Sequence, residues 1–262
     1  MLLRSLAITF IGLFVILPLV AITARSFEDG PARLWKDILQ PDALFSVQLT
    51  CALAFMMILI NAVMGTLTAW VLVRHSFPGK SIVNALIDLP FAIPTIVTGL
   101  MLVILYGPVS PIGRFLTAHG IEVIYAKPGI ILALLFVTLP FVVRAVQPVL
   151  MEMDPEIEEA AMTLGANRWT AFRRVVMPSI LPAVLTGSAQ AFSRALGEFG
   201  SVVVVAGNIP FRTQVAPVYI YGEIESYNPR GALAVSVMLL AISLGVLIAL
   251  NLLQRWGRNR ES

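Results

Sequence analysis

Residues 151–180 read MEMDPEIEEAAMTLGANRWTAFRRVVMPSI. This is a charged segment between two long apolar runs, and we call it the polar island. Because most of the remaining chain is apolar enough to lie in a membrane, the polar island is expected to lie in water at the membrane surface. A membrane protein with one such segment is expected to use it to hold something in the water phase.

The composition is typical of an integral membrane protein. Hydrophobic residues make up 58% of the 262 residues and charged residues 13%, whereas soluble proteins average about 45–50% apolar and roughly 25% charged. The mean hydropathy is +0.88. The net charge of +3 comes without a basic cluster interleaved with aromatic residues, which gives no support to nucleic-acid binding. The single cysteine, Cys51, excludes an intrachain disulfide.

Six apolar runs predict an all-α integral membrane protein with one domain over residues 1–262 and core spans over about 44–253. The spans are expected at 2–24, 44–73, 81–106, 128–150, 181–206 and 232–253, with polar loops at 25–42, 107–127 and 207–230. The first run resembles a signal peptide, but it continues past Pro18 without a clear cleavage site, which favours a retained helix. Pro90 and Pro94 predict a kink or break in the third span, and we find no second segment that matches it.

The charge distribution predicts the orientation of the spans. An even number of spans places both termini on one side. Nine lysines and arginines fall on the side of the polar island, seven on the other side, and two within spans, which together make 18. Because positive residues favour the cytoplasmic side, we expect the polar island and both termini in the cytoplasm.

Helix signals divide the polar island into two short amphipathic helices. Asp154 suits the N-cap of the first, Pro155 its first helical position and Gly165 its C-terminal stop. Asn167 can cap the second helix. An apolar stripe is expected on each helix, formed by Ile157, Ala160, Ala161 and Leu164 on the first and by Trp169, Phe172 and Val176 on the second.

The end of the polar island and its role are predicted less directly. Pro178 and Pro182 are expected to end the second helix and redirect the chain into the fifth span. The polar island fits a solvated connector on the lipid headgroups, and it fits equally a knob whose apolar face enters a partner's groove. The physical properties of these residues leave both interpretations open.

The spacing Glu159-Ala160-Ala161-x3-Gly165-x9-Val175-x-Met177-Pro178 resembles the EAA motif of permease subunits in ATP-binding-cassette (ABC) importers. The family pattern ends in I-x-L-P, and V-x-M-P is a mild apolar departure. The resemblance implies a type I ABC importer permease fold, with 151–180 as the cytoplasmic coupling loop whose helix sits in a cleft of the ATPase subunit. It assigns the coupling positions to Glu159, Ala160, Ala161 and Gly165.

A closer resemblance covers most of the chain and is to sulfate/thiosulfate permease subunits, with a lean toward the T (also called U) subunit. It rests on Phe77–Lys80, Asp88–Ala92, Pro140–Arg144, Leu196–Gly200, Gly207–Ile209 and Arg212–Thr213. It implies sulfate/thiosulfate import by alternating access in a bacterial inner membrane. The implied partners are a second permease subunit in a heterodimer, an ATPase dimer and a periplasmic sulfate-binding protein. Molybdate and tungstate permeases, which are expected to be homodimers, share much of the pattern and remain an alternative.

No nucleotide site or catalytic site is recognisable. Gly79-Lys80-Ser81 resembles part of a P-loop, but that pattern requires a glycine at position 74, which is Arg74. We therefore expect a translocation subunit and not an enzyme, without a cofactor of its own, and with ATP and Mg bound by the partner ATPase. A self-sufficient ion-coupled anion transporter is the alternative of another class.

Four charged residues within the spans are further candidates, because a charge in a bilayer costs about 2.5–3.5 kcal/mol even on the lenient insertion scale. Arg194 and Glu198 are four apart on one helical face, so they fit either a translocation path or gate, or an ion pair between helices or subunits. Asp88 is expected to cap a half-helix at the proline break, with substrate contact as the alternative. Arg144 is expected to extend to the cytoplasmic membrane surface.

Overall fold

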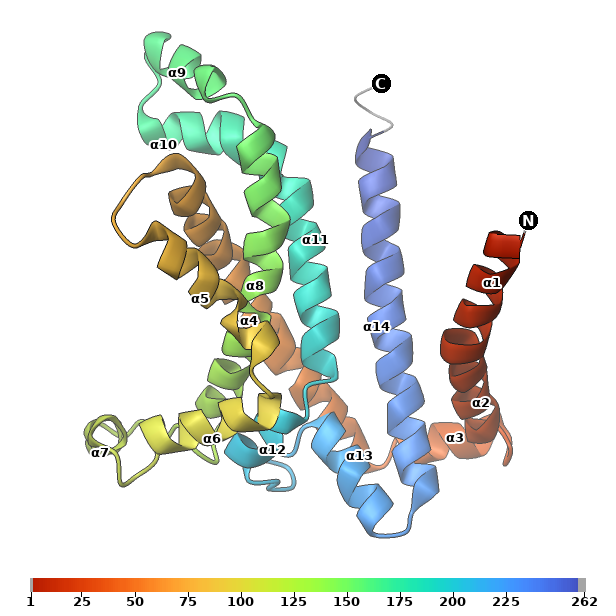
Figure 1. Cartoon of the computed structure of the whole chain (residues 1–262). Helices are drawn as coiled ribbons and strands as arrows, with labels where there is room; N and C mark the ends of the chain where they lie inside the picture. The colour runs from red at the N-terminus through yellow and green to blue at the C-terminus, as the bar shows by residue number, and fades with distance from the viewer. Residues whose placement is uncertain (1, 259–262) are drawn as a thin grey trace.

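The protein is described here by a computed structural model that covers residues 2–258, and within that range the chain is helical without a strand (Figure 1). In order, the elements are α1 (Leu2–Ile11), the π-helical turn η1 (Gly12–Ile16), α2 (Leu17–Ser26), α3 (Pro31–Ile38), α4 (Pro41–Arg74), α5 (Lys80–Ala92), α6 (Thr95–Tyr106), α7 (Pro111–Ala118), α8 (Lys127–Glu152), α9 (Pro155–Thr163), α10 (Arg168–Ala171), the π-helical turn η2 (Phe172–Val176), α11 (Met177–Leu196), α12 (Gly200–Ala206), α13 (Ala216–Glu225) and α14 (Pro229–Arg258).

Among the described residues the helices give five spans, or six if one bent pair counts as a span, against the six that the apolar runs predict. Five stretches among the described residues are long and apolar enough to cross a membrane: Leu3–Ser26, Pro41–Arg74, Lys127–Glu152, Arg168–Leu196 and Pro229–Ala249. The sixth is the pair α5 and α6, which bends by 113°. The bend follows from Pro94, where the chain leaves α5 in extended conformation before α6 begins. The all-α membrane fold is therefore confirmed.

The centre of the molecule is a bundle of α4, α8 and α11, and small residues set its spacing. A Cβ atom added to Gly65 of α4 would lie 2.9 Å from Cβ of Val142, and one added to Gly187 of α11 would lie 2.8 Å from the carbonyl oxygen of Phe141. Close backbone approach at small residues is the usual means of packing helices inside a membrane. The side chains around this contact are fully buried, with Val142, Val143 and Val146 at 0% exposure.

A second broken helix, which we did not expect, follows the first. The run 181–206 is not one span, because α11 ends at Leu196 and α12 begins at Gly200 after a short non-helical link. α12 packs against α6, and a Cβ on Gly99 would lie 2.6 Å from the carbonyl oxygen of Ser201. Each broken helix thus contributes its short second half to one close contact. Among the described residues, α5 with α6 is the one bent pair that could form a broken span, and the break after α11 is a further interruption that the sequence did not predict.

The polar island ends differently from the prediction. Pro178 and Pro182 do not stop the second helix, because α10, η2 and α11 form one helical stretch from Arg168 to Leu196. The helix contains the π-helical turn η2 just before Pro178. In this turn the N–H of Met177 donates to the carbonyl oxygen of Phe172, five residues back. Pro178 follows closely after η2, and the helix continues through it.

The outer elements complete the fold. Three segments expected as loops carry the short helices α3, α7 and α13, which lie at the end of the molecule opposite α9 (Figure 1). The α1–α2 stretch stands beside α14, away from the central bundle, with no buried residue in α2. The start of α1 and the end of α14 lie toward the side that carries α9, as an even number of spans requires. Arg260, one of the positive residues counted for orientation, lies outside the described residues.

Replacing Gly187 with leucine is expected to destabilise the bundle. The new side chain would meet backbone atoms of α8 at Phe141 and Val142, which cannot move aside as a side-chain rotamer can. Overpacking of this kind lowers the free energy of unfolding by about 2 kcal/mol. Thermal unfolding of the purified chain in detergent measures it. The matched control is Gly245→Leu, in another span, where an added Cβ meets nothing within 4 Å. Equal shifts in both variants would contradict this account of the packing.

Candidate functional site

The first helix of the polar island has the boundaries that its sequence predicts. Asp154 accepts a hydrogen bond from the N–H of Glu156 at 3.0 Å, and Pro155 occupies the first turn of α9. Gly165 follows α9 with φ of +91°, a left-handed conformation that favours glycine. The N–H of Ala166 returns to the carbonyl of Ala161 at 3.1 Å, which completes a Schellman motif.

The second helix of the polar island also begins as predicted. Asn167 caps it by accepting a hydrogen bond from the N–H of Thr170 at 2.8 Å. The residues of its apolar stripe have different environments. Val176 is buried in the bundle, whereas Trp169 is 65% exposed and stacks on Phe172. The sharp turn at Gly165 therefore sets α9 outside the bundle while α10 joins it (Figure 1).

The apolar stripe of α9 is not covered by the described part of the chain. Ile157 is 51% exposed and Leu164 is 89% exposed. Glu159 and Ala160 are exposed as well, and Ala161 is half-buried. Exposed apolar side chains grouped at one end of a molecule indicate an interaction surface, and the small Ala160 side chain lets another surface approach the helix backbone closely.

One ion pair holds α9 to the bundle. Nε of Arg74 donates to Oε1 of Glu158 at 2.7 Å, and its Nη2 donates to the carbonyl oxygen of Met153 at 3.1 Å. The two side chains are 14% and 18% exposed, so the pair is largely shielded from water. It joins the last residue of α4 to the middle of α9 and leaves the neighbouring Glu159 facing outward. This pair could not be predicted from sequence patterns, because its members are 84 positions apart.

Arg194 and Glu198 form an ion pair of 2.7 Å at the break between α11 and α12. Glu198 lies beyond the end of α11, so the two residues do not share one helix as expected. The Glu198 carboxylate is 1% exposed and also accepts from the N–H and Oγ of Ser201, at 2.9 and 2.8 Å. It therefore fastens the start of α12. Arg194 keeps 35% of its side chain exposed.

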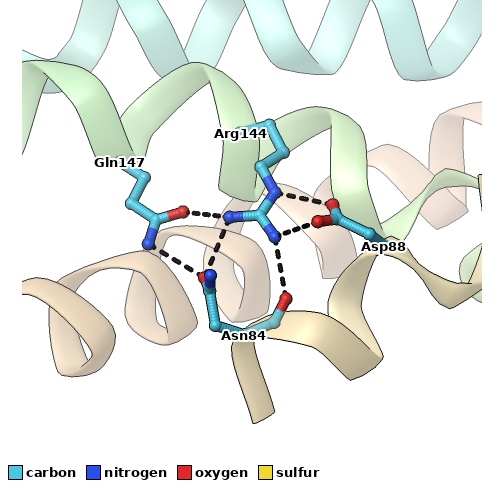
Figure 2. A network of polar contacts seen from close by, with 4 residues as sticks. All are labelled: Asn84, Asp88, Arg144 and Gln147. Carbon is cyan, nitrogen blue, oxygen red and sulfur yellow. Dashed lines mark hydrogen bonds and ion pairs between the residues drawn. The ribbon is translucent and has the colours of Figure 1, made fainter. Parts of the chain in front are cut away.

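Asp88 is not a helix cap, because it lies within α5 and receives two hydrogen bonds from Arg144 of α8 (Figure 2). Arg144 does not extend to the membrane surface either, since its guanidinium points across to α5. Asn84 and Gln147 complete the network. The sequence analysis missed these two, although polar pairs on one face of each apolar helix, four apart in α5 and three apart in α8, were a visible signal.

These features match one family of transport proteins. The sequence profile described as "binding-protein-dependent transport system inner membrane component" matches residues 61–259. The chain belongs to this family of ABC permeases. It is 45% identical to the sulfate transport system permease protein CysT of Synechocystis sp., over 96% of this chain and 88% of that protein. It is 42% identical to CysT of Escherichia coli (strain K12), over 96% of this chain and 91% of that protein.

Solved structures show the same fold. A bacterial alginate ABC transporter, in complex with an alginate pentasaccharide-bound periplasmic protein, has a chain that superposes with a TM-score of 0.79 and 18% identity, covering 97% of the permease and 94% of that chain. A chain of the MetNI methionine ABC transporter, in an inward-facing conformation, superposes with a TM-score of 0.59 and 19% identity, over 80% and 93%. The type I ABC importer permease fold is confirmed.

The family also confirms the kind of protein. The permease is a multi-pass translocation subunit and not an enzyme. The EAA motif and the coupling helix that were expected from residues 159–178 belong to this family, and α9 is the helix on which the motif begins.

Removing the arginine of the α4–α9 ion pair is expected to loosen α9. In Arg74→Gln the shielded Glu158 carboxylate loses a charge-assisted partner, and such bonds contribute about 1.5–3 kcal/mol. Amide hydrogen exchange across residues 155–163 should accelerate by about tenfold or more, since 1.4 kcal/mol corresponds to a factor of ten. The control is Arg173→Gln, an exposed arginine of the same polar island. Unchanged protection of α9 in Arg74→Gln would show that the pair does not position this helix.

Proposed function

We propose that the permease is a transmembrane subunit of an ATP-driven ABC importer for sulfate, with thiosulfate as a second substrate. The observation that carries this proposal is 42–45% identity, over 95–96% of this chain, to several proteins named as sulfate transport system permeases. The match covers nearly the whole chain, so it is not confined to the EAA motif.

The polar island is the proposed ATPase contact. The exposed apolar stripe of α9 is proposed to form the contact, together with Glu159 and Gly165. The small side chain of Ala160 lets the partner approach the helix backbone closely. An amphipathic helix that lays its apolar face into a groove is a common recognition mode. An ATPase dimer that carries ATP and Mg would take one such helix from each of two permease subunits. The second subunit is proposed to be a related chain, which would make a heterodimer.

The opposite end of the molecule is the proposed contact for a periplasmic sulfate-binding protein. The short helices α3, α7 and α13 lie there (Figure 1). The permease is proposed to lie in the bacterial inner membrane with α9 and both termini in the cytoplasm, and the distribution of lysines and arginines supports this orientation.

Alternating access is the proposed mechanism. Closure of the ATPase pair on ATP moves the coupling helices, and the helix bundle opens toward the periplasm, where the binding protein releases the anion. Return of the bundle then delivers the anion inward. The covalent continuity of α8 with α9 and the Arg74–Glu158 pair supply two connections from the ATPase contact into the bundle.

Arg194 is proposed to border the anion path, because its partly exposed guanidinium lies at a break in a spanning helix. Glu198 neutralises part of its charge. A path must not hold its ion so tightly that release becomes slow, and a half-neutralised arginine attracts a dianion without trapping it. Asp88 is proposed to serve the contact between α5 and α8 and not the substrate, because both of its oxygens bind Arg144.

The assembled complex in liposomes tests the cargo. We expect uptake of radioactive sulfate only with binding protein outside and ATP inside, and we expect excess thiosulfate, but not molybdate, to compete. Uptake driven by molybdate without sulfate competition would assign the permease to the molybdate class, in which a homodimer is expected. Anion flux through the isolated chain without an ATPase would instead favour an ion-coupled transporter.

The coupling role of the polar island has its own test. Gly165→Asp is expected to leave membrane insertion intact and to reduce copurification of the ATPase and ATP-dependent uptake by about tenfold or more, because the left-handed turn is strained and a charge enters the contact surface. The matched control is Gly120→Asp. Gly120 also has a positive φ (+76°) and open space around it, but it lies at the opposite end of the molecule. Normal uptake by Gly165→Asp would refute the role of this turn.

A further inference from the structure

We propose that Arg144 is a positioning residue that makes α5 and α8 move as one unit, so that movement of the coupling helix α9 reaches the bent helix α6. This inference rests on the proposed function, because it concerns how an ATP-driven movement passes through the bundle. The inference is based on a hydrogen-bond network between two helices (Figure 2). It joins Asn84 and Asp88 of α5 to Arg144 and Gln147 of α8.

Every donor of the Arg144 guanidinium already has an acceptor within the chain. Nε and Nη2 donate to the two carboxylate oxygens of Asp88, at 2.7 and 2.5 Å. Nη1 donates to Oδ1 of Asn84 at 2.9 Å and to Oε1 of Gln147 at 2.6 Å, and Nη2 also donates to the backbone oxygen of Asn84 at 2.8 Å. A guanidinium has five N–H donors, so none remains for a passing oxyanion. Arg144 therefore connects two helices and does not serve as an anion ligand.

The network is a major part of the attachment of α5. The principal helical neighbour of α5 is α8. Within α5, which the structure describes completely, the buried residues are Ile87 and Pro90. Phe91 adds one edge-on contact with Phe141, at 5.4 Å between ring centroids. Because few apolar side chains hold α5, the four hydrogen bonds that Arg144 makes to Asn84 and Asp88 are expected to decide whether α5 follows α8.

The network lies between the coupling helix α9 and the bent helix α6 along the chain. From Arg144, α8 continues to Glu152, and α9 begins three residues later at Pro155. In the other direction α5 leads through the 113° bend into α6, which packs on α12 at Gly99. Packed helices respond to a switch by shifting as bodies. A shift of α8 that starts at the ATPase contact is therefore carried by Arg144 into α5 and on to the α6–α12 contact.

A distance measurement tests the unit directly in the otherwise unaltered complex. Spin labels are placed at Ser81→Cys on α5 and Met151→Cys on α8, in a Cys51→Ser background; both positions are exposed. We expect one narrow label-to-label distance that is the same without nucleotide and with ATP bound. A change of that distance between the two states would overturn the inference, because α5 would then move relative to α8.

Kinetic variants separate positioning from anion binding. Arg144→Lys keeps the charge but loses the planar fork, and Asp88→Asn removes the acceptor charge. In the complex with its ATPase and binding protein, each is expected to lower the kcat of sulfate uptake by about tenfold, as the loss of a charge-assisted hydrogen bond allows. The sulfate KM is expected to stay unchanged and the ATP consumed per sulfate to rise.

The control is Arg4→Lys, at an exposed arginine of α1, which stands away from the central bundle and from both proposed partner contacts; no effect is expected there. A raised KM with unchanged kcat in Arg144→Lys would assign Arg144 to the anion and overturn the inference, as would an unchanged ratio of ATP to sulfate. If the wild-type complex fails to move sulfate, the proposed function fails, and the label distance still decides whether α5 and α8 form one unit.

Discussion

The organisation of this permease depends on the requirement that a charge inside an apolar bundle be paired. An unpaired charge at membrane depth costs several kcal/mol on any scale, and three arginines of the bundle each have a carboxylate partner elsewhere in the chain. The pairs join α4 to α9, α8 to α5, and α11 to the start of α12, through Arg74–Glu158, Arg144–Asp88 and Arg194–Glu198. Each pair lies where a span ends, bends or breaks. Electrostatic pairing thus fastens the irregular parts of the chain to the regular bundle.

Close packing of complementary helix surfaces stabilises the bundle itself. Gly65 and Gly187 bring α4 and α11 into backbone contact with α8, and the valines between them are fully buried. Such a core behaves as a solid body, because close-packed interiors shift between discrete arrangements instead of deforming gradually. Outside it, α5 and α6 have few buried apolar residues of their own, whereas the short α12 buries Val202, Val205 and Ala206. Their positions follow from the polar ties and from the glycine contact between α6 and α12.

The local parts of this structure could be predicted from sequence, and the distant contacts could not. The caps of the polar island act over three or four residues, so Asp154, Gly165 and Asn167 gave correct helix boundaries. Pro178 misled, because the helix continues through a π-helical turn just before the proline instead of ending there. The break after Leu196 contains no proline that would predict it. The partners of Arg74 and Arg144 lie 84 and 56 positions away, a distance over which helical periodicity carries no information.

The same pairing rule bears on how the permease can pass an anion at all. A free arginine at membrane depth would attract a divalent oxyanion and, in a medium of low dielectric constant, would hold it strongly. Arg144 has no free donor, and Arg194 shares its charge with the buried Glu198. Neither is therefore placed to form a deep binding well. A transporter built in this way needs its affinity in a separate binding protein and its direction from a separate ATPase. The uncovered surface of α9 at one end, and the short helices at the other, are where such partners would have to act.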